Sequence, residues 1–218
     1  MHLLPFAEIF RRVAQSVQES QIPSVSEIAG IDRDPFQILI STVLSLRTKD
    51  PVTAAASRRL FDTAGTAREM VKLSEKEIQD LIYPVGFYRV KAKNIITISR
   101  TLLEKYDGKV PSSQEALMEL PGVGLKTANL TLSLGFELPY ICVDTHVHRI
   151  SNRLGWVETR TPLETEQALQ TVLPRKHWLE INELFVRFGQ SMCTPQSPWC
   201  SKCPLQEGCP RRGVERNR

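Results

Sequence analysis

The stretch that decides the fold is Leu120-Pro121-Gly122-Val123-Gly124-Leu125-Lys126-Thr127-Ala128-Asn129. Before it, Ser112 and Glu115 have the S-x-x-E spacing of a capping box, which predicts a short helix that carries Leu117 and Leu120. After it, apolar residues continue at helical spacing and predict a second helix. Glycines reach positive φ angles and lack a Cβ atom, so the turn can bring backbone N–H groups close to an anion. A plain glycine turn between two helices is the alternative interpretation.

Two polar side chains near this turn point to chemistry. Lys126 falls in the first turn of the second predicted helix, where the helix dipole disfavours a charged ammonium and so favours the neutral amine that acts as a nucleophile. Eighteen residues further along, Asp144 precedes another apolar helical pattern. Asp144 is predicted to be an N-cap, and capping alone would explain its presence.

The LPGVG-x-KTAN turn and the VDTH segment at Val143-Asp144-Thr145-His146 together resemble the endonuclease III family of base-excision DNA glycosylases, in the helix-hairpin-helix superfamily. The resemblance covers almost the whole chain. It implies that Lys126 is the catalytic lysine, that Asp144 is the catalytic carboxylate, and that the partner is double-stranded DNA with a damaged base or an abasic site. Further DNA contacts are expected from Gly122, Val123, Gly124, Thr127 and His146.

Two more residues are assigned through the resemblance. In the family a bulky apolar residue at a Gly-x-Tyr turn wedges into the duplex, and Phe87 in Gly86-Phe87-Tyr88 has that place here. The family's gap-filling position is often glutamine in bacterial members, whereas this chain has Arg47. An arginine can still fill the gap and donate to an unpaired base edge. The family's preference for the base opposite the lesion is therefore not transferred to this chain.

The C-terminal segment contains four of the five cysteines at the spacing C-x6-C-x2-C-x5-C, namely Cys193, Cys200, Cys203 and Cys209. Prolines interrupt this segment, so it needs a cross-link. Disulfides are disfavoured because nothing marks the chain as secreted. The spacing leaves structural zinc and an iron-sulfur cluster open, although zinc modules usually bring two close cysteine pairs. The family resemblance implies a [4Fe-4S] cluster on all four cysteines.

The cysteine loop departs from the family in one respect. In many members the segment between the first two cluster cysteines carries basic residues that approach DNA, and residues 194–199 have none. Lys202, Arg211 and Arg212 are the available replacements. Cys142, outside the cluster, is expected to be a small buried residue.

Helical patterns run through the rest of the chain and few segments read as strands, which predicts an all-α fold. N-caps are expected at Asp34, Asp50, Ser74 with Glu77, and Thr161. Further helices are expected at 5–20, 91–105 and 177–190. By the resemblance, a six-helix lobe spans 22–136, and a second lobe joins 1–21 to 137–218 with the cluster loop at 193–209. The hairpin and Asp144 would then meet at a cleft between the lobes.

Composition excludes some classes of function. The formal net charge of +4 and the basic C-terminal tail permit a nucleic-acid partner. No apolar run approaches the ~20 residues of a membrane span, and the N-terminus lacks the charged-then-apolar order of a signal peptide. An intracellular monomer that binds no membrane is expected.

The activity that the family resemblance implies is that of a bifunctional DNA glycosylase and AP lyase, which removes damaged pyrimidines through a lysine Schiff base and nicks the strand by β-elimination. One alternative is a mismatch-specific glycosylase of the same superfamily, acting on thymine, uracil or adenine. The alternative from another class is a non-catalytic DNA-binding scaffold. An electron carrier is disfavoured by the single cluster beside a DNA-binding motif.

Overall fold

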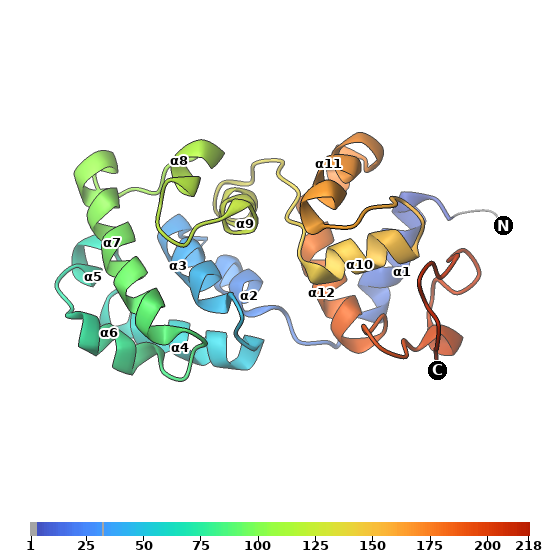
Figure 1. Ribbon diagram of the computed structural model, residues 1–218, viewed down its shortest axis with the longest axis horizontal. Coiled ribbons are helices and arrows are strands. Elements are labelled where there is room, and N and C mark those ends of the chain that lie inside the picture. Colours follow the sequence, from blue (N-terminus) through green and yellow to red (C-terminus); the bar gives the residue numbers. More distant parts are fainter. Residues whose placement is uncertain (1–3, 32) are drawn as a thin grey trace. The chain divides into compact units, whose positions relative to one another are not determined.

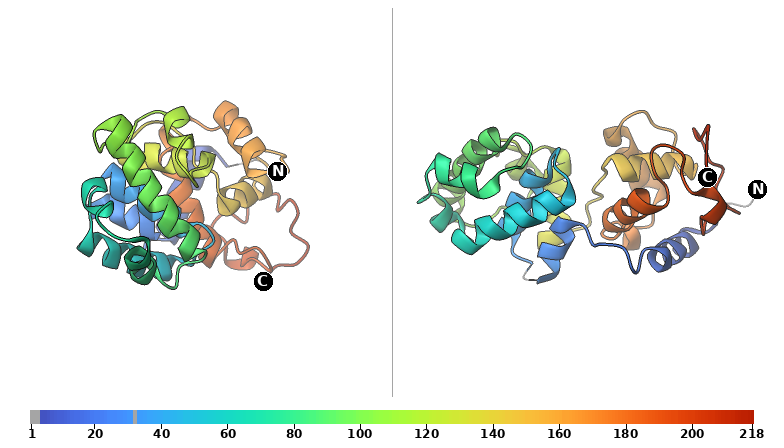
Figure 2. Two further views of the ribbon diagram at one scale, coloured as in Figure 1. Left: turned by 60° about the vertical axis from the view of Figure 1, so that its left-hand side comes forward. Right: turned by 90° about the horizontal axis from the view of Figure 1, so that it is seen from below.

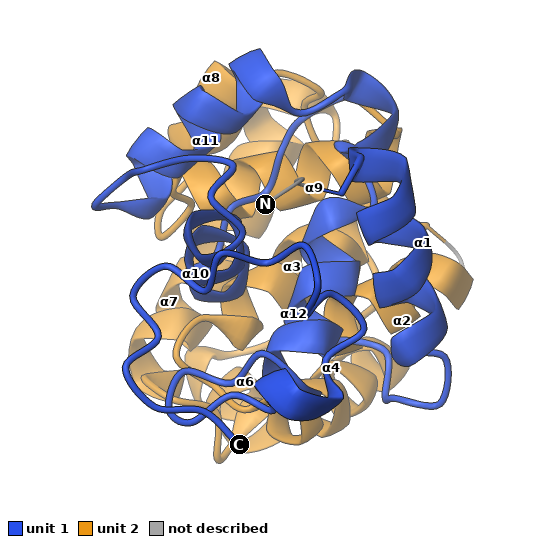
Figure 3. Cartoon of the chain, turned by 90° about the vertical axis from the view of Figure 1, so that its right-hand side faces the viewer, with its two compact units in different colours: residues 1–23, 139–218 blue, residues 24–138 orange. Residues whose placement is uncertain are grey.

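The structure is a computed structural model that describes residues 4–31 and 33–218, and in these residues it is helical without any strand (Figures 1 and 2). The predicted all-α class is therefore confirmed. Contacts divide the chain into unit 1, Met1–Pro23 with Pro139–Arg218, and unit 2, Ser24–Leu138, which Figure 3 shows in separate colours. The sequence placed the corresponding bounds at 22 and 136.

Unit 2 is built around α3 (Pro35–Ser45). Every residue from Ile38 to Leu44 is buried, because α2, α4, α7 and α9 all pack against this helix. The described part of unit 2 contains eight helical segments where six were expected, two of them only four and five residues long. Besides α3, these segments are α2 (Ser24–Ile31), α4 (Asp50–Thr63), α5 (Ala67–Met70), α6 (Glu75–Ile82), α7 (Tyr88–Tyr106), α8 (Gln114–Met118) and α9 (Leu125–Phe136).

Unit 1 joins the N-terminal helix to the C-terminal third of the chain. Its core is aromatic: Phe10 stacks on His177 with ring centroids 4.0 Å apart, and Trp156 and Phe185 pack beside them. Its helices are α1 (Phe6–Ser16), α10 (Thr145–Arg153), α11 (Pro162–Val172), α12 (Ile181–Ser191) and the 3-10 turns η1 (Arg175–His177) and η2 (Cys200–Lys202).

Most predicted helix starts are confirmed by the cap geometry. Asp34 accepts a hydrogen bond from the Phe36 backbone at 2.8 Å, and Ser74 with Glu77 forms the expected capping box. Thr161 caps α11 through the Glu164 backbone at 3.2 Å.

Three expected helix starts were wrong. Ser113 caps α8 in place of Ser112, because its hydroxyl accepts from the Ala116 backbone. Asp50 is the first residue of α4 and not its N-cap, and its carboxylate accepts from the Ser24 hydroxyl at 3.1 Å. The last long helix begins at Ile181, since the chain from Arg175 first makes a 3-10 turn.

The remaining helix bounds shift by a few residues. α1 ends at Ser16, four residues before the expected end, and α7 extends the expected 91–105 segment at both ends. In the described ranges, no helix combines the length and the apolar character that a membrane crossing requires.

Candidate functional site

The turn between α8 and α9 is fixed by two buried side chains and one glycine. Leu120 and Val123 are buried, and the Val123 backbone donates to the Leu120 carbonyl at 3.1 Å. Gly122 has φ +78, and a Cβ atom there would stand 2.6 Å from Nδ2 of Asn94. Position 122 therefore needs glycine for its backbone and for its packing.

The N-terminus of α9 is open. Gly124 is its N-cap with extended backbone and, within the described residues, no side chain caps this end. A Cβ atom on Gly124 would meet nothing within 4 Å. The first amides of a helix have no carbonyl one turn back to bond, and the helix dipole is positive there. This arrangement suits an anion.

Lys126 is the second residue of α9 and is half-buried. The next residue, Thr127, is 1% exposed, and Val123 is also buried. The side chains of Thr127 and Val123 therefore belong to the packing of the hairpin, and a ligand could reach only their backbone. Lys126 and the glycines remain at the accessible side of the motif.

Asp144 caps α10, as predicted. Its Oδ1 accepts from the backbones of His146 at 2.8 Å and Val147 at 2.9 Å. The residues before it are buried, and Asn182 holds them by donating to the Cys142 carbonyl at 3.2 Å. Cys142 is thus the small buried residue that was expected. Asp144 lies in unit 1 and Lys126 in unit 2.

The helix that Asp144 caps is attached to the cysteine loop by two arginines. Arg149 donates to the carbonyls of Gly189 at 3.1 Å and Cys193 at 2.9 Å, and it contacts Nδ1 of His146 at 3.2 Å. Arg153, only 7% exposed, donates to Sγ of Cys193 at 3.3 Å. His146 is therefore part of a packed network between α10 and α12.

The four predicted ligand cysteines border one pocket, whose other walls include Ile150, Leu154, Phe188 and Leu205. None of the four is in a disulfide. Burial raises the pKa of the Cys203 thiol to about 11 and also raises those of Cys200 and Cys209. Several thiolates can share this apolar pocket only when positive charge compensates them. In the described ranges, no three His, Cys, Asp or Glu side chains form a group suited to a single metal ion.

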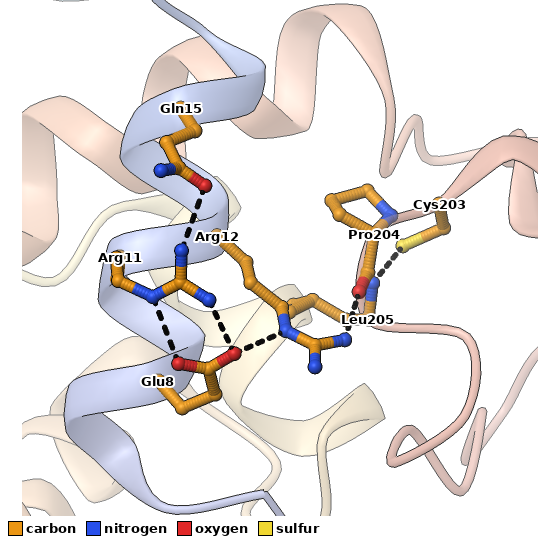
Figure 4. A network of polar contacts seen from close by, with 7 residues as sticks. All are labelled: Glu8, Arg11, Arg12, Gln15, Cys203, Pro204 and Leu205. Carbon is orange, nitrogen blue, oxygen red and sulfur yellow. Dashed lines mark hydrogen bonds and ion pairs between the residues drawn. The ribbon is translucent and has the colours of Figure 1, made fainter.

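The cysteine loop is also tied to α1 (Figure 4). Glu8 binds Arg11 and Arg12, each at 2.6 Å, and Arg12 donates to the Pro204 carbonyl at 3.0 Å. The adjacent Leu205 backbone donates to Sγ of Cys203 at 3.4 Å. The two arginines hold the pKa of Glu8 at about 2, well below its ordinary 4.5.

Arg47 and Phe87 lie close together on two neighbouring turns of unit 2. The Arg47 guanidinium carbon is 5.6 Å from the centroid of the Phe87 ring, and Phe87 is 61% exposed. Both have left-handed backbones, with φ of 54 and 58. Strain of this kind at non-glycine residues gathers at functional sites.

Sequence reasoning missed three cations that hold these parts in place: the buried Lys91 and Arg153, and the partly buried Arg149. Lys91 is 6% exposed and donates to two carbonyls and one hydroxyl. The sequence signal for Arg149 and Arg153 was their spacing, because they stand four residues apart on the helix that follows Asp144. Lys91 reads in the sequence as an ordinary helix lysine.

Comparison with known proteins identifies the family. The model of the HhH-GPD superfamily of base excision DNA repair proteins matches residues 40–175. Endonuclease III of Thermotoga maritima is 54% identical over 82% of this chain and 84% of its own. A solved endonuclease III, trapped as a covalent intermediate with DNA, is 34% identical, with a TM-score of 0.82 over 95% of this chain and 96% of that one. A thermostable thymine-DNA glycosylase, 23% identical, shares the fold with a TM-score of 0.73 over 91% and 95% of the two chains. This chain belongs to the endonuclease III family of the HhH-GPD superfamily.

Proposed function

We propose that the protein is a bifunctional DNA glycosylase and AP lyase of base excision repair, which removes oxidised pyrimidines from duplex DNA and then nicks the strand. The observation that carries this proposal is the placement of Lys126 directly after the open glycine turn, at the N-terminus of α9. A phosphate-binding turn alone has no need of a lysine nucleophile beside it. Family membership and the relative trapped covalently on DNA support the same chemistry.

Lys126 and Asp144 are the catalytic pair of the proposal. The neutral Nζ of Lys126 attacks C1′ of the flipped nucleotide, the C1′–N bond to the base breaks, and the base leaves. Asp144 takes the proton that the amine releases. Both cap bonds of Asp144 use Oδ1, so Oδ2 can accept this proton. The C1′–O4′ bond then breaks as O4′ takes a proton, which gives the Schiff base between Lys126 and C1′. Loss of a C2′ proton from the Schiff base expels the 3′ phosphate by β-elimination.

Duplex binding uses the hairpin and the two exposed turns. The amides of Gly122 and Gly124 bind a backbone phosphate, which positions the DNA without reading its sequence. Val123 and Thr127 contribute backbone only, because their side chains are buried. Phe87 and Arg47 fill the space that the flipped base leaves. His146 contacts Arg149, and Arg149 joins the helix that Asp144 caps to the Cys193 carbonyl.

Cys193, Cys200, Cys203 and Cys209 hold the cofactor, a [4Fe-4S] cluster. The donor set fits this group, because four free cysteines border one pocket and Arg153 and the Leu205 backbone donate to two of the sulfurs. The cluster would supply positive charge to the partly buried thiolates and would take part in no step of base excision. Structural zinc, the other occupant that the cysteine spacing leaves open, fits less well, because among the described residues no three such side chains form a group suited to a single metal ion.

A mismatch glycosylase and a non-catalytic DNA-binding scaffold fit these residues less well. A mismatch glycosylase that only removes a base has no use for Lys126, and a DNA-binding scaffold has no use for the pair of Lys126 and Asp144. We propose that the protein acts inside the cell as a monomer.

A panel of duplexes tests this proposal. Each carries thymine glycol, 5-hydroxycytosine, dihydrouracil, a thymine or uracil mismatch, or a preformed abasic site. Excision of the oxidised pyrimidines with nicking at the same position is expected. Base removal from mismatches without nicking would favour the mismatch glycosylase. Binding without base loss or nicking would favour the scaffold.

A further inference from the structure

Two turns of unit 2 carry the exposed pair Arg47 and Phe87. The first turn, Leu46-Arg47-Thr48, follows α3, and the second, Val85-Gly86-Phe87, precedes α7. Arg47 and Phe87 both have φ values that side chains rarely adopt, 54 and 58. Such conformations persist only when the surroundings hold them in place.

The two turns contact each other through their backbones. Gly86 donates its N–H to Oγ1 of Thr48 at 3.2 Å. A Cβ atom at position 86 would stand 2.5 Å from the Arg47 carbonyl oxygen, so glycine is what permits this approach. The Arg47 guanidinium lies over the Phe87 ring. The turns therefore form one surface feature, which we call the wedge: residues 46–48 and 85–87.

The Lys91 ammonium lies beneath the wedge. It donates to the carbonyls of Leu44 at 2.8 Å and Leu46 at 2.5 Å, and to Oγ1 of Thr48 at 3.2 Å. An ammonium has three protons, and these three acceptors use them all. Leu44 is in the last turn of α3, where carbonyls have no partner within the helix and a cation is favoured.

Lys91 also joins the second turn to the first. It lies in the first turn of α7, and its own N–H donates to the Phe87 carbonyl at 3.0 Å. Its backbone thus fixes the turn of Phe87 while its side chain fixes the turn of Arg47. Because Lys91 is 6% exposed and its protons are committed, it has no role as a direct DNA contact.

We propose that Lys91 is a positioning residue that holds Arg47 and Phe87 as one preformed wedge, ready to enter the gap left by a flipped nucleotide. The inference rests on the proposed function, which supplies the role of Arg47 and Phe87. A wedge that is already ordered need not lose conformational freedom when it meets the duplex, so base flipping is favoured. At an abasic site there is no base to unstack, so the wedge matters less there.

The test compares Lys91→Met with Lys93→Met in the complete protein. Both substitutions remove one positive charge from α7, but Lys93 is exposed, so its loss leaves the wedge intact. A second probe, Thr48→Val, removes the shared acceptor and keeps the shape of the side chain. It covers the case in which Lys91→Met does not fold. Thermal unfolding first establishes which variants are folded at the assay temperature.

Two activities and one optical signal are measured. Lys91→Met is expected to lower excision of thymine glycol at least about 10-fold, while nicking of a preformed abasic duplex falls less than about 3-fold. Fluorescence of 2-aminopurine placed beside a tetrahydrofuran abasic analogue reports unstacking on binding, and its rise should be smaller in Lys91→Met. Thr48→Val should change all three readouts in the same direction, and Lys93→Met should match wild type.

A double-mutant cycle separates positioning from general stability. If the Lys91 side chain acts through the Arg47 turn of the wedge, adding Lys91→Met to Arg47→Ala lowers excision by less than about 3-fold more, because the side chain whose turn it holds is already gone. Equal loss of excision and nicking, or a full additional loss in the Arg47→Ala background, would overturn the inference. If wild type excises no lesion, the proposed function fails, and the 2-aminopurine signal still decides the positioning role.

Discussion

Lys126 is the second residue of α9, directly after the open glycine turn, and its amine is the proposed nucleophile. We expect Lys126→Gln to bind duplex DNA with little change and to lose both base excision and strand nicking, because the amide is not a nucleophile. Borohydride should trap the wild-type protein on an abasic duplex as a reduced Schiff base, visible as a shifted band in a denaturing gel. Comparable trapping of the Gln variant would rule Lys126 out as the nucleophile.

Asp144 has a structural task and a proposed chemical one. Asp144→Asn should slow single-turnover excision about 10²-fold or more, since an amide cannot accept the proton. Asparagine caps helices well, so the free energy of unfolding should fall by about 1 kcal/mol or less. Duplex affinity, measured by anisotropy, serves as the control and should change little. An unchanged excision rate would leave Asp144 with the cap alone.

The buried position of Lys91 predicts that the stability of the fold depends on pH. Burial lowers its pKa from 10.5 to about 8. Between these values the unfolded chain keeps a proton that the folded protein has lost, so rising pH stabilises the fold. Each pKa unit is worth about 1.4 kcal/mol, which bounds the gain at about 3.5 kcal/mol.

Urea unfolding of wild type and Lys91→Met at pH 7.5 and pH 10 measures this gain. The difference in the free energy of unfolding should move in favour of wild type as the pH rises. Lys93→Met should follow wild type at both values. A difference between wild type and Lys91→Met that does not change with pH would contradict the lowered pKa.

Local sequence identifies a functional residue when its role depends on the residues next to it in the chain. Gly122, Lys126 and Asp144 stand in short motifs, and the geometry of the turn and the cap follows from those motifs. Lys91 and Arg153 act on atoms about 40 residues away in the chain. No local pattern distinguishes such a cation from one that is solvated, so their roles appear only with the fold.

At the scale of the helix, the two glycines of the hairpin should respond differently to a methyl group. Gly122→Ala is expected to cost about 1–2 kcal/mol from the left-handed backbone, and Asn94 must also move. Gly124→Ala has open space and extended backbone, so only a weaker N-cap is expected, about 1 kcal/mol or less.

The two glycine substitutions should rank differently in their effect on DNA affinity than in their effect on stability. The methyl group of Gly124→Ala lies on the open side of the turn, where the phosphate would approach, so affinity for a duplex with an abasic analogue should fall. Urea unfolding and anisotropy give the two quantities for each variant. Unchanged affinity in Gly124→Ala would show that DNA does not approach this side of the turn.

Helix starts were predictable where one residue offered the only cap, as at Asp34 and Ser74. They were not predictable where neighbours competed. Ser112 and Ser113 are both good caps, and the structure uses the second. Asp50 instead accepts from the Ser24 hydroxyl, a partner 26 residues away. Cap chemistry therefore locates a helix start to within one or two residues, and tertiary contacts choose among them.

At the scale of the whole molecule, the sequence predicts four cysteine ligands in the cysteine loop but not the contacts that support this loop. Helical periodicity says nothing about a segment broken by prolines. The structure shows that this segment is held from outside, by Arg12 on α1 and by Arg153 on α10. The conformation of the loop therefore depends on contacts with two helices of unit 1.

The last prediction concerns this dependence. If the four cysteines hold a [4Fe-4S] cluster, the purified protein should be yellow-brown with broad absorbance near about 400 nm, from charge transfer between thiolate and iron. Four thiolates on a 2+ cluster leave a local charge of −2, which Arg153 beside Cys193 partly offsets. Without iron, the partly buried Cys203 thiol remains protonated, because burial raises its pKa to about 11. The loop then loses its cross-link.

Cys203→Ala should therefore give colourless protein with a much lower melting temperature or poor solubility, and activity should fall in proportion to the folded protein that is lost. Cys142→Ala is the matched control, because Cys142 is buried outside the loop and its removal should leave the absorbance near wild-type strength. Stoichiometric zinc in a colourless wild-type preparation would refute the cluster and leave the glycosylase proposal standing. A soluble, colourless Cys203→Ala protein of full stability would instead refute the structural role, because the contacts from Arg12 and Arg153 would then suffice to hold the loop.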